Sequence, residues 1–130
     1  MIDGYESIYD GECCRILGSD AVRSHWVEYS AQRAGKKSVM KVGMILRKLA
    51  DFGPQLLRNK EQFRHEGAFS YGRGQVAVYA VKDFQLRVYG GFVHVEGKST
   101  FLCVESVAKK SDKASKDLLA RVGRALGEQK

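Results

Sequence analysis

Apolar and polar positions alternate with a two-residue period in the C-terminal third of the chain, the pattern that a β-strand produces. One predicted strand begins near residue 86 and ends before a turn at Gly97. One of its faces carries Leu86, Val88 and Phe92, and the other carries Arg87, Tyr89 and Val93. A strand among apolar neighbours would hold the guanidinium group of Arg87 in a fixed position.

The strand that follows is largely apolar on both faces. Phe101, Cys103 and Val107 are predicted on one face, and Leu102, Val104 and Ala108 on the other. A strand with two apolar faces is typical of the middle of a sheet, covered on both sides.

A charged loop follows this strand directly and carries Lys109, Lys110 and Lys113. Helical spacing then returns, with Leu118, Val122, Ala125 and Leu126 on one face. Ser115 is the predicted N-cap of this helix and Gly127 its predicted end. Positive charge is therefore expected at the end of a rigid strand, where a polyanion could reach it.

The N-terminal half begins with a short predicted strand, residues 13–17, which Gly18 ends. A first helix, capped by Ser19 or Asp20, should reach about residue 32. A tight connection at residues 34–36 leads to a second helix that Ser38 caps and that Gly53 and Pro54 end. So short a connection predicts an antiparallel helical hairpin.

Residues 63–74 mix aromatic, basic and glycine residues and are predicted as an irregular loop with a short strand around Phe63. A strand over residues 76–81 and a turn at Lys82 and Asp83 follow. The predicted order is β-α-α-β-β-β-α, an α+β fold in which the helical hairpin covers one face of an antiparallel meander. Residues 12–130 form one predicted domain. The acidic residues 1–11 could fray, add an edge strand or lie on a basic surface.

The charge balance favours a nucleic acid or an acidic protein as the partner. The formal net charge is +7, and it is divided into −4 for residues 1–20 and +11 for the rest. A basic protein with neither partner remains an alternative. Three cysteines, an odd number, indicate a reducing compartment, and the chain has neither a signal peptide nor an apolar run of about 20 residues. We therefore expect a cytoplasmic protein without a zinc site or another cofactor.

Three segments together resemble the RelE/ParE toxin superfamily, and most closely its phage-derived HigB-type branch. They are Phe63-Arg64-His65, Arg87 within the strand Leu86-Arg87-Val88-Tyr89, and the loop Lys109-Lys110-Ser111-Asp112-Lys113. The C-terminal match covers about forty residues. The chain departs from some ribosome-dependent members in two ways: it has no lysine in residues 76–81, and no tyrosine in the last helix.

The resemblance implies metal-independent cleavage of mRNA, usually on the ribosome, in which a ribose 2′-OH attacks the adjacent phosphate. Arg87 and Lys110 are then the candidates for stabilising the charge on phosphorus, and His65 is the acid–base candidate. The candidate RNA-contacting residues are Arg64, Arg73, Lys109, Lys113 and Tyr89. Ordinary surface positions remain the alternative reading of each.

The resemblance also implies a partner, a small antitoxin that is often a helix-turn-helix protein. Two other functions remain open. The first is a non-catalytic protein of the same fold that inhibits a target such as DNA gyrase, and the second is a phage RNA-binding accessory protein.

Overall fold

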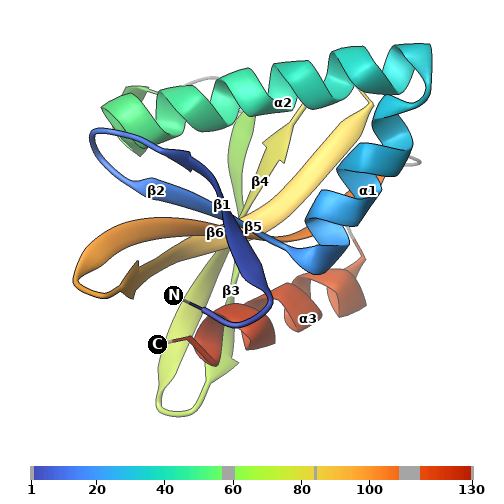
Figure 1. The fold of residues 1–130 in the computed structure, drawn as a ribbon. Helices are drawn as coiled ribbons and strands as arrows, with labels where there is room; N and C mark the ends of the chain where they lie inside the picture. The colour runs from blue at the N-terminus through green and yellow to red at the C-terminus, as the bar shows by residue number, and fades with distance from the viewer. Residues whose placement is uncertain (1, 57–60, 84, 109–114, 130) are drawn as a thin grey trace.

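The computed structural model describes residues 2–56, 61–83, 85–108 and 115–129. Figure 1 shows a sheet with helices on both of its faces. The elements in chain order are β1 Tyr5–Asp10, β2 Arg15–Ser19, α1 Asp20–Ser30, α2 Arg33–Phe52, the short 3-10 helix η1 Pro54–Leu56, β3 Phe63–Tyr71, β4 Gly74–Lys82, β5 Leu86–Val95, β6 Lys98–Ala108 and α3 Lys116–Gly127.

The described strands form one mixed sheet in the order β1-β2-β6-β5-β4-β3. Strands β3 to β6 form an antiparallel meander, and β2 pairs in parallel with β6. Helices α1 and α2 lie on one face, called the α1/α2 face, and α3 lies on the other, called the α3 face (Figure 1). The predicted α+β class is confirmed. The sheet has more strands than predicted.

Strand β6 lies between β2 and β5, so its predicted central position is confirmed. Phe101 and Cys103 pack in the core of the α1/α2 face, and Leu102 and Val104 in that of the α3 face. Val107 was predicted to share a face with Cys103, and this was wrong because it packs on the α3 face.

A β-bulge explains the displacement of Val107. Tyr89 pairs with Glu105 and Gly90 with Cys103, which leaves Val104 as an extra residue in β6. One extra residue reverses the face of every later side chain in a strand.

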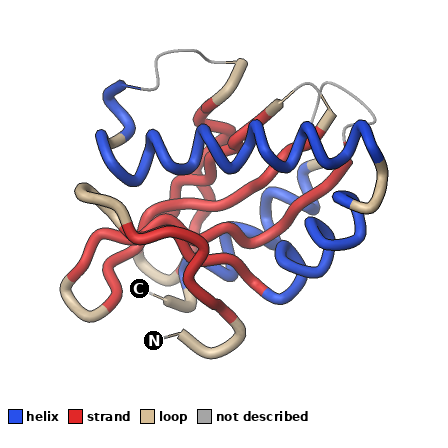
Figure 2. The backbone as a smooth tube through the Cα atoms, turned by 45° about the horizontal axis from the view of Figure 1, so that its top comes forward, coloured by secondary structure: helices blue, strands red, loops and turns tan. Residues whose placement is uncertain are grey.

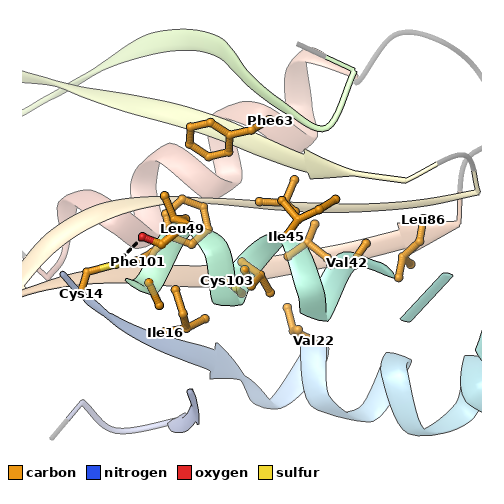
Figure 3. Packing of buried hydrophobic residues seen from close by; sticks show 14 residues of the cluster. Cys14, Ile16, Val22, Val42, Ile45, Leu49, Phe63, Leu86, Phe101 and Cys103 are labelled. Atoms are coloured by element: carbon orange, nitrogen blue, oxygen red, sulfur yellow. Dashed lines mark hydrogen bonds between the residues drawn. The ribbon is translucent and has the colours of Figure 1, made fainter. Parts of the chain in front are cut away.

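Two cores result, one on each face of the sheet. On the α1/α2 face, side chains of α2 such as Val42, Ile45 and Leu49 pack over Ile16 and Phe101 of the sheet (Figure 3). On the α3 face, Leu119, Val122 and Leu126 of α3 pack over β3, β4, β5 and β6 from the opposite side of the sheet. Burial from both sides fixes the positions of the strand ends, which carry the candidate site.

The predicted helix caps of α1 and α3 are confirmed. The hydroxyl of Ser19 accepts a hydrogen bond from the backbone N–H of Val22, and that of Ser115 accepts one from Leu118. Gly53 is the C-cap of α2, with a φ of 86°, a conformation that suits glycine.

The predicted start of α2 at Ser38 was wrong. The helix begins at Arg33, and Ser38 is a buried residue within it. The chain turns at residues 31–32, and Gly35 lies so close to the carbonyl oxygen of Tyr29 that a Cβ atom would overlap it. Helices α1 and α2 therefore meet at a corner rather than lying antiparallel along their length (Figures 1 and 2).

The prediction of an irregular loop over residues 63–74 was also wrong. Residues 63–71 form β3, an edge strand that pairs with β4 across a tight turn at Gly72. Phe63 packs in the core of the α1/α2 face, and Phe69 packs against that of the α3 face. A register shift between His65 and Gly67 hides the strand period from the sequence.

Residues 5–10 form the edge strand β1, one of the three alternatives for the acidic segment. The strand pairs with β2, and the carboxylate of Glu6 lies 3.0 Å from the guanidinium of Arg23. The hydroxyl of Tyr9 donates hydrogen bonds to the carboxylate of Asp51, at 3.0 and 3.2 Å, which raises the pKa of Tyr9. The segment thus lies at the edge of the sheet opposite β3.

Candidate functional site

Arg87 lies on the α3 face of the sheet near the start of β5. Its neighbours Leu86 and Val88 belong to the core of the α1/α2 face, and Tyr89 belongs to that of the α3 face. Side chains alternate along a strand, so Arg87 shares its face with Tyr89. Its side chain is almost covered, and only 6% of the residue's surface is exposed. An arginine held in this way has little freedom to move and can present its guanidinium in one orientation.

Two further cations lie on the same face of the neighbouring strands. Lys82 of β4 is the register partner of Arg87. Arg64 of β3 pairs with Ala80, which belongs to the α3-face core and precedes Lys82 by two residues. Arg64, Lys82 and Arg87, called the basic cluster below, therefore follow one another across three adjacent strands at one end of the sheet.

Glu66 adds a carboxylate to the basic cluster. It occupies the register shift in β3, and its Oε1 lies 4.0 Å from Nζ of Lys82. Both side chains are largely covered, with 14% of Glu66 and 12% of Lys82 exposed. A shielded carboxylate beside a lysine is a pair that can accept and donate protons. The sequence did not predict this pair, because its patterns assign Lys82 to a turn and residues 63–74 to a loop.

The described part of β6 ends beside the basic cluster. Strand β6 ends at Ala108, which pairs with Leu86, the residue before Arg87. The predicted site residues Lys109, Lys110 and Lys113 lie outside the described residues. The chain is described again from Ser115, the N-cap of α3.

The structure does not bring His65 to Arg87. The ring of His65 contacts that of Tyr79, with the centroids 5.2 Å apart, and Tyr79 packs against the core of the α1/α2 face. His65 therefore lies on the opposite face of the sheet from Arg87. The sequence could not show this, since it requires the register of β3.

Two other candidates, Tyr89 and Arg73, are covered or are placed away from the basic cluster. Tyr89 is buried in the core of the α3 face, so its ring is not available for stacking on a base. Arg73 is exposed at the turn between β3 and β4, at the far end of β3 from Arg64. Glu105 accepts a hydrogen bond from Nε of Arg121 at 2.9 Å, a pair that ties β6 to α3.

A second polar group lies on the α1/α2 face and joins α1 to β6. The buried hydroxyl of Ser106 accepts a hydrogen bond from Nε1 of Trp26 at 3.0 Å and lies 2.8 Å from Nδ1 of His25. The ring of His25 stacks on Tyr29. These contacts orient α1 on the sheet. Sequence patterns did not reveal this group, because His25 and Trp26 are some 80 positions from Ser106.

The cysteines differ in accessibility, which predicts selective alkylation. Burial raises the pKa of Cys14 to about 11, and burial also raises the pKa of Cys103, whereas Cys13 is exposed. At pH 8 the two buried groups stay as unreactive thiols. We expect iodoacetamide to label one site in the native protein and three in denaturant, as counted by mass spectrometry. Cys13→Ser should remove the native label, and rapid native labelling of that variant would contradict the burial of Cys14 and Cys103.

Comparison with family models, curated proteins and solved structures found no match. Within the part of the chain that the structure describes, no helix has the length and apolar character that crossing a membrane requires. No group of three or more His, Cys, Asp or Glu residues within that part is placed to hold a metal ion.

Proposed function

We propose that the protein is a toxin-like endoribonuclease that cleaves mRNA, in most cases on the ribosome, without a metal ion. The proposal rests on the resemblance in sequence, and one structural observation supports it. The nearly buried Arg87 lies with Lys82 and Arg64 on one face of three adjacent strands, near the end of β6. Such a row of cations can neutralise the phosphate backbone of RNA.

In the proposed reaction a ribose 2′-oxygen attacks the adjacent phosphorus and the bond from phosphorus to the 5′-oxygen breaks. Glu66 takes the proton of the 2′-OH, and the ammonium of Lys82 gives a proton to the leaving 5′-oxygen. The products are a 2′,3′-cyclic phosphate and a 5′-hydroxyl. Arg87, together with Lys110 from the loop, stabilises the extra negative charge on the pentacoordinate phosphorus. Glu66 takes the role for which His65 was the candidate, because His65 lies on the other face.

The test is RNA cleavage by the purified protein in EDTA, with and without ribosomes. Wild-type protein should produce fragments ending in 2′,3′-cyclic phosphate. Arg87→Ala should lower the rate by about 10²- to 10³-fold, the usual effect of removing one group that stabilises the transition state. Arg124→Ala, which removes an exposed cation of α3, should cleave like wild type. Full activity of Arg87→Ala would contradict the proposed role of this residue.

A second candidate function is that of a non-catalytic RelE/ParE-like protein that inhibits a target such as DNA gyrase. Two observations favour it: the described residues of β4 carry a single cation, Lys82, and His65 faces away from Arg87. In this case RNA stays intact with or without ribosomes, while gyrase supercoiling is inhibited. If the protein binds RNA without cleaving it, and its expression does not inhibit growth, a phage RNA-binding accessory protein is the better interpretation.

The proposed partner is a small antitoxin, often a helix-turn-helix protein, that neutralises the toxin by covering its basic surface. Charge supports such a partner, because the net charge of residues 21–130 is +11.

A further inference from the structure

The outer face of α2 combines a dense positive charge with two exposed methionines. Six of its residues are cationic: Arg33, Lys36, Lys37, Lys41, Arg47 and Lys48. Met40 and Met44 lie one helical turn apart among them, with 62% and 61% of their surfaces exposed. These eight residues are called the α2 ridge. It is separate from the basic cluster, which lies on the α3 face.

The ridge is not needed to hold the helix on the sheet. The inward positions of α2 are Val42, Ile45, Leu46 and Leu49, together with the small residues Gly35, Ser38 and Ala50, and all of them are buried. Figures 1 and 2 show α2 on the outside of the molecule, with its outer side turned away from the sheet. Two large apolar side chains at the centre of such a face are exposed at a cost in free energy, and they therefore indicate a contact surface.

One end of the α2 ridge already contacts another part of the chain, the edge strand β1. The guanidinium of Arg47 lies 5.2 Å from the centre of the Tyr9 ring, and the hydroxyl of Tyr9 donates to Asp51. Tyr9 belongs to β1, whose sequence also contains Glu6 and Asp10. An aromatic side chain of the edge strand thus packs against one cation of α2 within the chain itself.

We propose that the rest of the α2 ridge binds an acidic, amphipathic segment of a partner protein. Apolar side chains of the partner would cover Met40 and Met44, and its carboxylates would pair with Lys37, Lys41 and Lys48. Methionine side chains adapt their shape to an apolar partner, and the surrounding lysines select an acidic one. RNA phosphates would use the cations but not the methionines, and two methionines give little area for insertion into a lipid surface. The proposal does not depend on the function proposed above.

The test uses a fluorescent synthetic peptide helix with leucines at i, i+3, i+4 and i+7 and glutamates at the remaining positions. Binding to the full chain is followed by fluorescence anisotropy at low and at physiological salt. We expect saturable binding that salt weakens, and no binding of a peptide with the same composition but scrambled leucines.

Two double variants separate the apolar from the charged part of the contact. Met40→Ser with Met44→Ser should weaken peptide binding about tenfold or more, since two apolar contacts are lost. Lys37→Glu with Lys41→Glu should weaken it further and reduce the dependence on salt. Arg124→Glu, at an exposed position of α3, is the matched control and should bind like wild type. Circular dichroism confirms that each variant is folded.

Three outcomes would overturn the proposal. The first is peptide binding that neither double variant weakens, which would place the contact elsewhere. The second is binding that only the charge variant weakens, which would make the ridge an ordinary electrostatic surface. The third is binding of phosphatidylserine-containing vesicles or of polyuridylate RNA that depends on Met40 and Met44, in the absence of peptide binding.

Discussion

Replacing Gly90 with alanine should destabilise the protein by about 3 kcal/mol or more, the upper range for overpacking a core. Gly90 sits at the bulge between β5 and β6, and a Cβ atom there would overlap the backbone carbonyl oxygen of Leu102. A backbone atom of a central strand cannot move away as a flexible side chain can. The alanine variant must therefore separate the two central strands or lose the bulge.

Urea denaturation of Gly90→Ala measures this loss. Gly43→Ala is the matched control, because a Cβ atom at Gly43 meets nothing within 4 Å and the residue lies inside α2. Alanine stabilises the interior of a helix by about 0.8–1 kcal/mol relative to glycine, so Gly43→Ala should be more stable than wild type. Wild-type stability in Gly90→Ala would mean that Gly90 of β5 does not approach the Leu102 carbonyl of β6 this closely.

The parts of the fold that were predicted correctly depend on local signals. The alternation along β5 assigned Leu86 and Tyr89 to opposite faces, and the two apolar faces of β6 predicted its central position. Serine caps such as Ser19 and Ser115 are likewise recognised within one helical turn. In each case the interaction that decides the structure lies within a few residues in the sequence.

The parts that were missed depend on strand pairing. The bulge in β6 moves Val107 to the α3 face, and the register shift in β3 conceals nine residues of strand. A bulge is defined by the partner strand, so a single strand's sequence does not reveal it. The placement of Ser38 fails for a similar reason, since a small polar residue suits both a helix cap and a buried position within a helix.

The candidate site shows the same division. Arg87 was selected because it stands on a predicted strand within a segment that carries the resemblance, and its own face could be assigned from the sequence. Lys82 and Glu66 become candidates only when β3, β4 and β5 are aligned, and the same alignment removes His65 from this face. The sequence thus identified two members of the basic cluster, Arg87 and Arg64, and the pairing of the strands supplied Lys82 and Glu66.

Glu66→Gln should separate catalysis from RNA binding, if Glu66 is the general base of the proposed reaction. Glutamine keeps the size and hydrogen-bonding capacity of the side chain but cannot take the 2′-OH proton. The rate of cleavage of bound RNA should fall by about 10²- to 10⁴-fold, the usual contribution of a general base. Affinity for RNA should stay equal or rise, because a negative charge beside Lys82 and Arg64 is removed.

Single-turnover cleavage and filter binding measure the two quantities on the same RNA. Glu128→Gln, which neutralises an exposed carboxylate after α3, is the control for the change in net charge and should alter neither. Lys82→Met should lower both the cleavage rate and the affinity for RNA. In the proposed reaction Lys82 contacts phosphate and also donates the proton to the leaving oxygen. If Glu66→Gln cleaves at the wild-type rate, Glu66 is not the base. If affinity and rate instead fall together, the carboxylate holds Lys82 in place and has no separate role in proton transfer.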